Sequence, residues 1–159
     1  MENDNEILWQ ALLDGVIDFI ATDHAPHTLA EKAQTYPNSP SGMPGVETSL
    51  ALMLTQAMQG RCTVAQVANW MSTAVAKAYK IPKKGAIAPG YDADLVLVDL
   101  DNYHPVLREE VVSKCGWNSF EGWNLTGWAV FTIVGGKVVY ERGKLNTDVR
   151  GEALRFDGD

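Results

Sequence analysis

Three side chains that can bind a metal ion or move a proton lie close together in the sequence, at Asp23, His24 and His27. A carboxylate can ligate a metal or accept a proton, and an imidazole can do either. An apolar run over residues 16–22 comes directly before them, and Pro26, which has no amide hydrogen, cannot continue a central strand. The pattern predicts a buried β-strand over 16–22 that presents these side chains at its carboxyl end, where catalytic residues gather in α/β folds.

The same residue types also have less specific uses, which stay open on spacing alone. An aspartate after a strand is often a turn former or a helix cap, and a histidine is often an ordinary polar loop residue. Residues 27–45 have no periodicity and are rich in proline and glycine. They are predicted to form a long loop, either one whose backbone approaches a ligand or a mobile surface excursion.

Helices are predicted on both sides of this stretch. They are expected at 5–13 before Gly15, at 46–59 before Gly60, from Thr63 with Gln66 in a capping-box pattern, and from Ser72 or Thr73 through Tyr79. Their apolar faces are interpreted as core rather than as cofactor contacts. A helix followed at once by a buried strand is the rhythm of an α/β fold.

The second half of the chain has a different composition, with glycine, proline and β-branched residues beginning at 81–85. We therefore predict a domain boundary near residue 81. A strand is expected at 94–100, and a hairpin is expected where Gly135-Gly136 separates 131–134 from 137–140. The tail after Leu145 is polar and is expected to be loosely held.

Bulk composition limits the class of protein. The 159 residues are 46% hydrophobic, enough for one packed domain, and carry a net charge of −7, which disfavours a nucleic-acid partner bound by broad electrostatics. No apolar run approaches the ~20 residues that span a bilayer, and the acidic start is the opposite of a signal peptide. Cys62 and Cys115 fit no metal or redox spacing, which favours a reduced, cytoplasmic compartment.

Several motifs together resemble the dihydroorotase family of the amidohydrolase superfamily. They are 22–27 (Thr-Asp-His-Ala-Pro-His), 41–48 (Ser-Gly-Met-Pro-Gly-Val-Glu-Thr), 85–96 (Gly-Ala-Ile-Ala-Pro-Gly-Tyr-Asp-Ala-Asp-Leu-Val), 120–123 (Phe-Glu-Gly-Trp) and 134–136 (Val-Gly-Gly). The resemblance covers nearly the whole chain in the right order. The first motif is the more specific, since related hydantoinases and allantoinases differ at the positions of Ala25 and His27, whereas 85–96 is shared across many amidohydrolases.

The resemblance implies an α/β fold that is the C-terminal portion of a TIM-type (β/α)8 amidohydrolase barrel, followed by part of a small β-sandwich. Residues 1–80 would hold the last helices, the eighth strand and the substrate loop, and residues 81–159 the sandwich part and tail. Because a complete barrel takes roughly 250 residues, the chain is expected to be a fragment, or to leave the rest of the enzyme on another chain.

The family is a zinc hydrolase that interconverts N-carbamoyl-L-aspartate and L-dihydroorotate in pyrimidine biosynthesis, with a zinc-activated water as nucleophile. The resemblance makes Asp23 a zinc ligand and the proton shuttle. It makes His27 the residue that holds the substrate carboxylate, and it places Pro44 and Gly45 where the backbone contacts the pyrimidine ring. His24 receives no assigned role.

The chain departs from the family pattern in its metal ligands. Its histidines are His24, His27 and His104, none forms the family's His-x-His, and no lysine can be placed on a barrel strand before Asp23. We therefore expect the chain alone to lack full zinc occupancy, to be inactive and to self-associate. Alternatives are a non-catalytic scaffold partnering aspartate transcarbamoylase, a related cyclic amidohydrolase, or a self-standing binding module.

The segment 115–123 is rich in tryptophan and glycine. Its aromatic residues are interpreted as sealing an interface, with a stacking platform for a carbohydrate or a base as the alternative. By resemblance, this segment lies back against the barrel.

Overall fold

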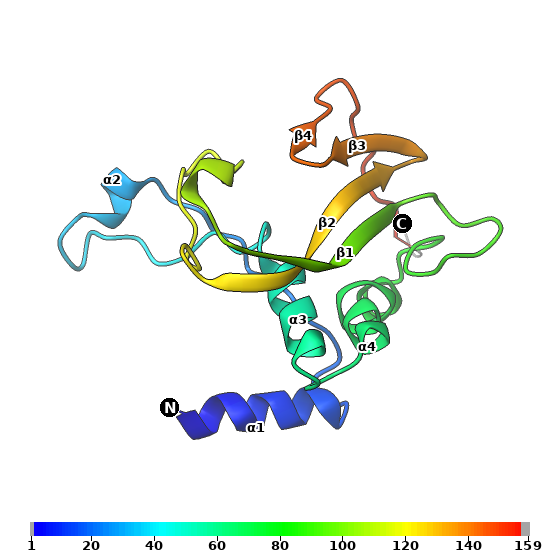
Figure 1. The fold of residues 1–159 in the computed structure, drawn as a ribbon, viewed down its shortest axis with the longest axis horizontal. Helices are drawn as coiled ribbons and strands as arrows, with labels where there is room; N and C mark the ends of the chain where they lie inside the picture. The colour runs from blue at the N-terminus through cyan, green and yellow to red at the C-terminus, as the bar shows by residue number, and fades with distance from the viewer. Residues whose placement is uncertain (1, 157–159) are drawn as a thin grey trace.

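The computed structural model describes residues 2–156, with a helical first half and a β-sheet in the second. The helices are α1 (Glu2–Leu13), α2 (Leu29–Lys32), α3 (Ser49–Met58), α4 (Val64–Ala68), the π-helical turn η1 (Asn69–Thr73), α5 (Ala74–Ala78) and the 3₁₀ turn η2 (Arg108–Glu110). The strands are β1 (Leu95–Pro105), β2 (Asn124–Val134), β3 (Lys137–Glu141) and β4 (Lys144–Leu145). Figure 1 shows α3 and α4 on one side of the long β1–β2 pair, and the loop with α2 extending away from the body.

The predicted helices are confirmed with small shifts in their ends. Thr63 caps α4 through the expected capping box, since its side chain accepts from the Gln66 amide and the Gln66 side chain accepts from the Thr63 amide. The last two predicted helices form one continuous helical run, because η1 joins α4 to α5. No helix within residues 2–156 is long and apolar enough to cross a membrane.

The sheet is antiparallel, with its strands in sequence order from β1 to β4. The hairpin between β2 and β3 is confirmed at Gly135-Gly136, where both φ angles are positive, at 54° and 77°. A two-residue turn of this kind requires positive φ at both positions and matches the twist of the flanking strands. Strand β1 is longer than predicted and continues to Pro105.

The core lies where α3 crosses β2. One cluster joins the buried Ala51 to Val106 and Leu125, and another joins Leu54 to Ala57 and Val67. The close approach depends on Gly127 of β2, because a Cβ there would lie 2.7 Å from the Leu54 Cβ, and its φ of +89° disfavours any other residue. Helix and sheet therefore share one apolar layer.

A hydroxyl in this layer ties the helix to an irregular point of the strand. Thr55 of α3 donates its hydroxyl to the Ala51 carbonyl at 2.7 Å and accepts from the Thr126 amide at 2.8 Å. The second bond satisfies a backbone N–H beside Gly127, where the β1–β2 register is interrupted. The buried Thr55 hydroxyl therefore both donates and accepts a hydrogen bond.

A cluster of ion pairs formed by Lys84, Asp92 and Asp94, called the latch below, holds the linker between the two halves against the β-hairpin. Lys84 forms ion pairs with Asp94 and, at 3.0 Å, with Asp92, while Asp94 also accepts from the Gly135 amide at 2.7 Å. The hydrogen bonds from Lys84 and Gly135 lower the pKa of Asp94, and the bonds to Asp94 and Asp92 raise the pKa of Lys84. The latch lies just beyond the predicted domain boundary near residue 81, which itself stays a prediction.

The prediction of a β-strand over 16–22 is wrong. These residues have no strand ladder, and the Ile20 amide donates instead to the Trp70 carbonyl at 3.1 Å. A strand exists through hydrogen bonds to neighbours, and no described strand lies beside this run. It is therefore an extended segment packed beside the helical run, and the four-stranded sheet contains none of it.

Candidate active site

Asp23 lies at the turn where the extended segment ends. Its φ of +44° is in the left-handed region, uncommon for a residue other than glycine. The side chain is exposed, and its carboxylate accepts no hydrogen bond from any other residue of the described chain. It is therefore free to meet a metal ion, water or substrate.

The segment that follows Asp23 runs beside the residues before α3. His24 and Met43 form an isolated parallel bridge, and the Ala25 amide donates to the Met43 carbonyl at 3.1 Å. Pro44 and Gly45 are buried. The structure thus places the segment directly after Asp23, through His24 and Ala25, beside Met43 and Gly45, which come from a later stretch of the chain.

His24 joins these two segments through its side chain. Its Nδ1 accepts from the Gly45 amide at 3.1 Å and from the Val46 amide at 3.4 Å. A nitrogen that accepts these bonds carries no proton, so the ring proton is on Nε2. His24 therefore holds the Gly45 backbone, a role that the motif spacing did not indicate.

Gly45 has a second reason to lack a side chain. A Cβ at this position would lie 3.2 Å from the Thr22 carbonyl oxygen and 3.3 Å from the Thr22 Cβ. Both distances are tighter than ordinary van der Waals contact, and Thr22 directly precedes Asp23. A side chain at Gly45 would therefore displace the backbone that carries the candidate catalytic carboxylate.

The predicted loop 27–45 has internal order. Thr28 caps the short helix α2 in a capping box with Glu31, and these hydrogen bonds lower the pKa of Glu31. Lys32 donates its ammonium to the carbonyl oxygens of Pro40 and Gly42, at 2.8 and 3.1 Å. These bonds tie the loop back on itself, and its contact with a ligand stays a prediction.

The segment 106–123 closes over this region from the other half of the chain. Trp117 donates its indole N–H to the His27 carbonyl at 2.7 Å, and Glu47 accepts from the Val112 and Ser113 amides at 3.0 and 2.7 Å. Trp117 thus joins the segment 106–123 to the backbone of His27, while its sealing of a domain interface stays a prediction. Trp123 differs, since it is 58% exposed.

The described residues do not form a zinc site by themselves. No group of three histidine, cysteine, aspartate or glutamate side chains is arranged within them to hold a metal ion. The Nδ1 atom of His24 already accepts hydrogen bonds from the Gly45 and Val46 amides. His104 belongs to β1, where it stacks on Trp128 with ring centroids 4.2 Å apart. Because a zinc site takes at least three protein ligands, Asp23 is one candidate position without companions among these residues.

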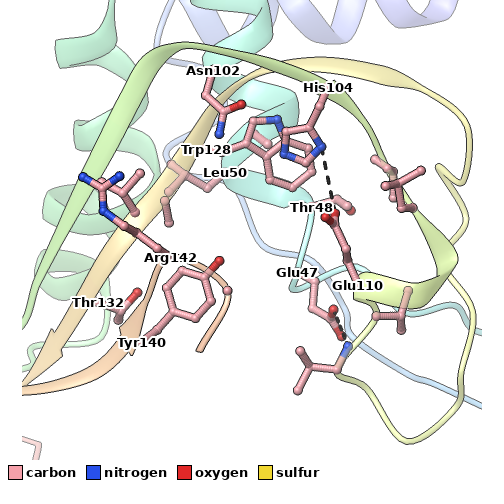
Figure 2. Close-up of a pocket in the computed structure, with 18 of the residues that line it drawn as sticks. Glu47, Thr48, Leu50, Asn102, His104, Glu110, Trp128, Thr132, Tyr140 and Arg142 are labelled. Carbon is pink, nitrogen blue, oxygen red and sulfur yellow. Dashed lines mark hydrogen bonds and ion pairs between the residues drawn. The ribbon is translucent and has the colours of Figure 1, made fainter. Parts of the chain in front are cut away.

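A wide groove lies elsewhere in the described part of the chain. It has a volume of about 1070 Å³ and runs between the sheet and the segment after β1. Figure 2 shows His104 stacked on Trp128 at one end and Tyr140 with Arg142 at the other, and Glu47 lies on its border. Neither Asp23 nor His27 lines this groove, so the size of a cavity does not locate the candidate chemistry.

Sequence and structure comparisons agree on the kind of protein. Residues 2–139 match the family model described as the Amidohydrolase family. The chain is 41% identical over 142 residues to a dihydroorotase of Bacillus caldolyticus, covering 89% of this chain and 33% of that protein, and 43% identical over 136 residues to a dihydroorotase of Halobacterium salinarum, covering 86% and 32%. The chain spans about a third of the length of the curated relatives it matches.

Solved structures extend the likeness to neighbouring activities. A D-hydantoinase structure superposes with a TM-score of 0.85 at 28% identity, covering 91% of this chain and 33% of that one. The L-hydantoinase (dihydropyrimidinase) from Arthrobacter aurescens superposes with a TM-score of 0.82 at 34% identity, covering 88% and 32%. With the family model matched over most of its length, this chain belongs to the amidohydrolase family.

Proposed function

We propose that this chain is the C-terminal third of a dihydroorotase, which interconverts L-dihydroorotate and N-carbamoyl-L-aspartate. The observation that carries the proposal is that the segment directly after Asp23 lies beside the backbone at Met43 and Gly45, held there by the His24–Met43 bridge and by the hydrogen bond from the Gly45 amide to His24. The identities near 40% to proteins named dihydroorotase support it. In this proposal, residues 1–80 complete a TIM-type barrel and residues 81–159 complete a β-sandwich.

The proposed roles follow from the chemistry of each group. In ring opening, the Asp23 carboxylate accepts a proton from the attacking water and passes it to the departing ring nitrogen, and ring closure reverses these transfers. Its exposed carboxylate, which accepts no hydrogen bond within residues 2–156, suits this work. His27 binds the ring carboxylate by a charge-assisted hydrogen bond, and the Pro44–Gly45 backbone contacts the pyrimidine ring.

Zinc is proposed as the metal of the complete enzyme, where it activates the attacking water. No three possible ligands lie together within the described residues, so we propose that Asp23 binds zinc with further ligands from outside them. No step above depends on the geometry of the metal.

Hydrolysis of L-dihydroorotate by the complete natural protein, followed by absorbance, tests the proposal. Asp23→Asn keeps the size but removes the charge and basicity, and it should lower kcat by about 100-fold or more. Asp18→Asn is a matched control, because Asp18 is also an exposed aspartate of the same segment. Near-normal turnover by Asp23→Asn would remove the carboxylate from the mechanism.

Hydantoin hydrolysis is the second candidate activity, favoured by the TM-scores to hydantoinase structures. Hydantoin has no ring carboxylate, so an enzyme that hydrolyses it does not need the hydrogen bond proposed between His27 and that carboxylate. Turnover of hydantoin with none of dihydroorotate would select this alternative.

Self-association and pairing with aspartate transcarbamoylase remain proposals. A second copy is supported by the position of β1 at the edge of the sheet, where its outer backbone groups have no strand beside them in the described chain. The unpaired cysteines Cys62 and Cys115 support a cytoplasmic location. Sedimentation of the protein with and without the transcarbamoylase would measure both associations.

A further inference from the structure

We infer that Trp117 is a positioning residue for His27, an inference that rests on the proposed function. The indole N–H of Trp117 reaches across 90 positions of sequence to donate to the backbone carbonyl of His27 at 2.7 Å. Both residues are partly buried. The bond fixes the backbone from which the imidazole reaches the substrate carboxylate.

Trp117 can act in this way because its loop is closed and internally packed. Val106 donates to the Trp123 carbonyl and Gly122 donates to the Val106 carbonyl, each at 2.9 Å, so the two ends of the loop are joined. Inside it, the buried Asn118 accepts from the Phe120 amide at 2.9 Å. This is the construction of an Ω-loop, a compact surface loop whose ends lie together.

The loop is anchored to the body at points other than Trp117. Phe120 packs against the core cluster around Leu125, and Glu47 accepts from two consecutive amides of the loop, Val112 and Ser113. Figure 2 shows the bond between the Glu47 carboxylate and the loop backbone. Glu47 lies two residues after Gly45, so the same loop is attached beside both proposed substrate contacts.

These attachments make the distance from His27 to the Pro44–Gly45 backbone depend on the Ω-loop. A binding group must be held within about 0.5 Å of its productive position to keep its effect. Asp23 is not joined to Trp117 by this hydrogen bond, and the bridge between His24 and Met43 holds the backbone next to it. Loss of the Trp117 donor should therefore weaken substrate binding more than proton transfer.

The test is Trp117→Phe in the complete natural protein, which removes the N–H donor and keeps an aromatic ring. KM for L-dihydroorotate should rise about three- to tenfold, the value of one neutral hydrogen bond, while kcat stays within about twofold. Trp123→Phe is the matched control, since Trp123 lies at the end of the same loop and its indole donates no hydrogen bond within residues 2–156. It should leave KM unchanged.

A double-mutant cycle identifies the route of the effect. If Trp117 acts through His27, Trp117→Phe should add little to the KM of His27→Ala. An equal rise of KM in both backgrounds, or a fall in kcat as large as the rise in KM, would overturn the inference.

Hydrogen exchange of the indole N–H groups, followed by NMR, does not depend on activity. The Trp117 indole should exchange at least several-fold more slowly than that of Trp123. If dihydroorotate is not turned over while Trp117 is protected, the proposed function fails and the contact stands. Equally fast exchange of the two indoles would overturn the contact itself.

Discussion

Replacement of His24 by asparagine and by glutamine separates its backbone contact from any other use of the imidazole. In asparagine the Oδ1 atom is bonded to Cγ, as Nδ1 is in histidine, so His24→Asn keeps an acceptor close to the Gly45 and Val46 amides. Glutamine places its polar atoms one bond farther out, near the position of Nε2. We therefore expect His24→Gln to lose the contact and His24→Asn to keep it.

The magnitude follows from the burial of Gly45. Its amide donates to His24 Nδ1 at 3.1 Å, and an unpaired buried N–H costs about 1–3 kcal/mol. The Val46 amide adds little, because its bond is longer, at 3.4 Å, and Val46 is exposed to water. Local opening at Gly45 should thus become about 5- to 150-fold more frequent in His24→Gln, and should change by less than about threefold in His24→Asn.

Amide hydrogen exchange at Gly45, measured by NMR on the wild type and both variants, reads this opening directly. Urea unfolding of the same samples separates a local change from a global one. Equal exchange rates at Gly45 in the two variants, with unchanged global stability, would mean that His24 does not hold this backbone.

Three further expectations follow from other contacts. His27→Ala in the complete protein should raise KM for dihydroorotate about 10- to 150-fold, the value of a charge-assisted hydrogen bond, and keep the metal content; loss of metal would make His27 a ligand instead. Gly127→Ala should lower the free energy of unfolding in urea by about 2–5 kcal/mol, because overpacking against α3 adds to backbone strain. Gly90 has a similar φ of +88° but open space around it, so Gly90→Ala should lower the free energy of unfolding by the backbone strain alone. Because the pKa of Asp94 is lowered on folding, its ion pair with Lys84 stabilises the fold above the ordinary aspartate pKa, and this stability is lost as pH falls through the folded pKa. In Asp94→Asn, the free energy of unfolding should therefore fall less steeply as the pH is lowered. An unchanged dependence on acid pH would contradict the stabilising role of the Lys84–Asp94 ion pair.

Local chemistry made the helices and the hairpin predictable. The Thr63 and Gln66 capping box, and the paired glycines 135 and 136, each encode a structure within a few residues. The candidate site rests instead on the motifs at 22–27 and 41–48, which lie side by side in the structure. The roles assigned to their residues stay predictions.

Contacts between distant segments were beyond such reasoning. The run 16–22 has the composition of a buried strand, but strand formation depends on neighbours that the described chain does not place beside it. The hydrogen bond from the Gly45 amide to His24 and the one from Trp117 to the His27 carbonyl both join distant parts of the sequence. The spacing of residues within a motif does not predict such contacts. A signal was present for Trp117 only in the aromatic, glycine-rich composition of its segment.

The central claim is that this chain supplies Asp23 and the substrate-binding segment of a dihydroorotase. The most direct measurement is L-dihydroorotate hydrolysis by a hybrid in which this chain replaces the matching third of the Bacillus caldolyticus protein, whose sequence is 41% identical over 142 residues. The account predicts measurable turnover that Asp23→Asn reduces by about 100-fold or more. A folded, metal-loaded hybrid without turnover, or one that Asp23→Asn leaves active, would contradict it.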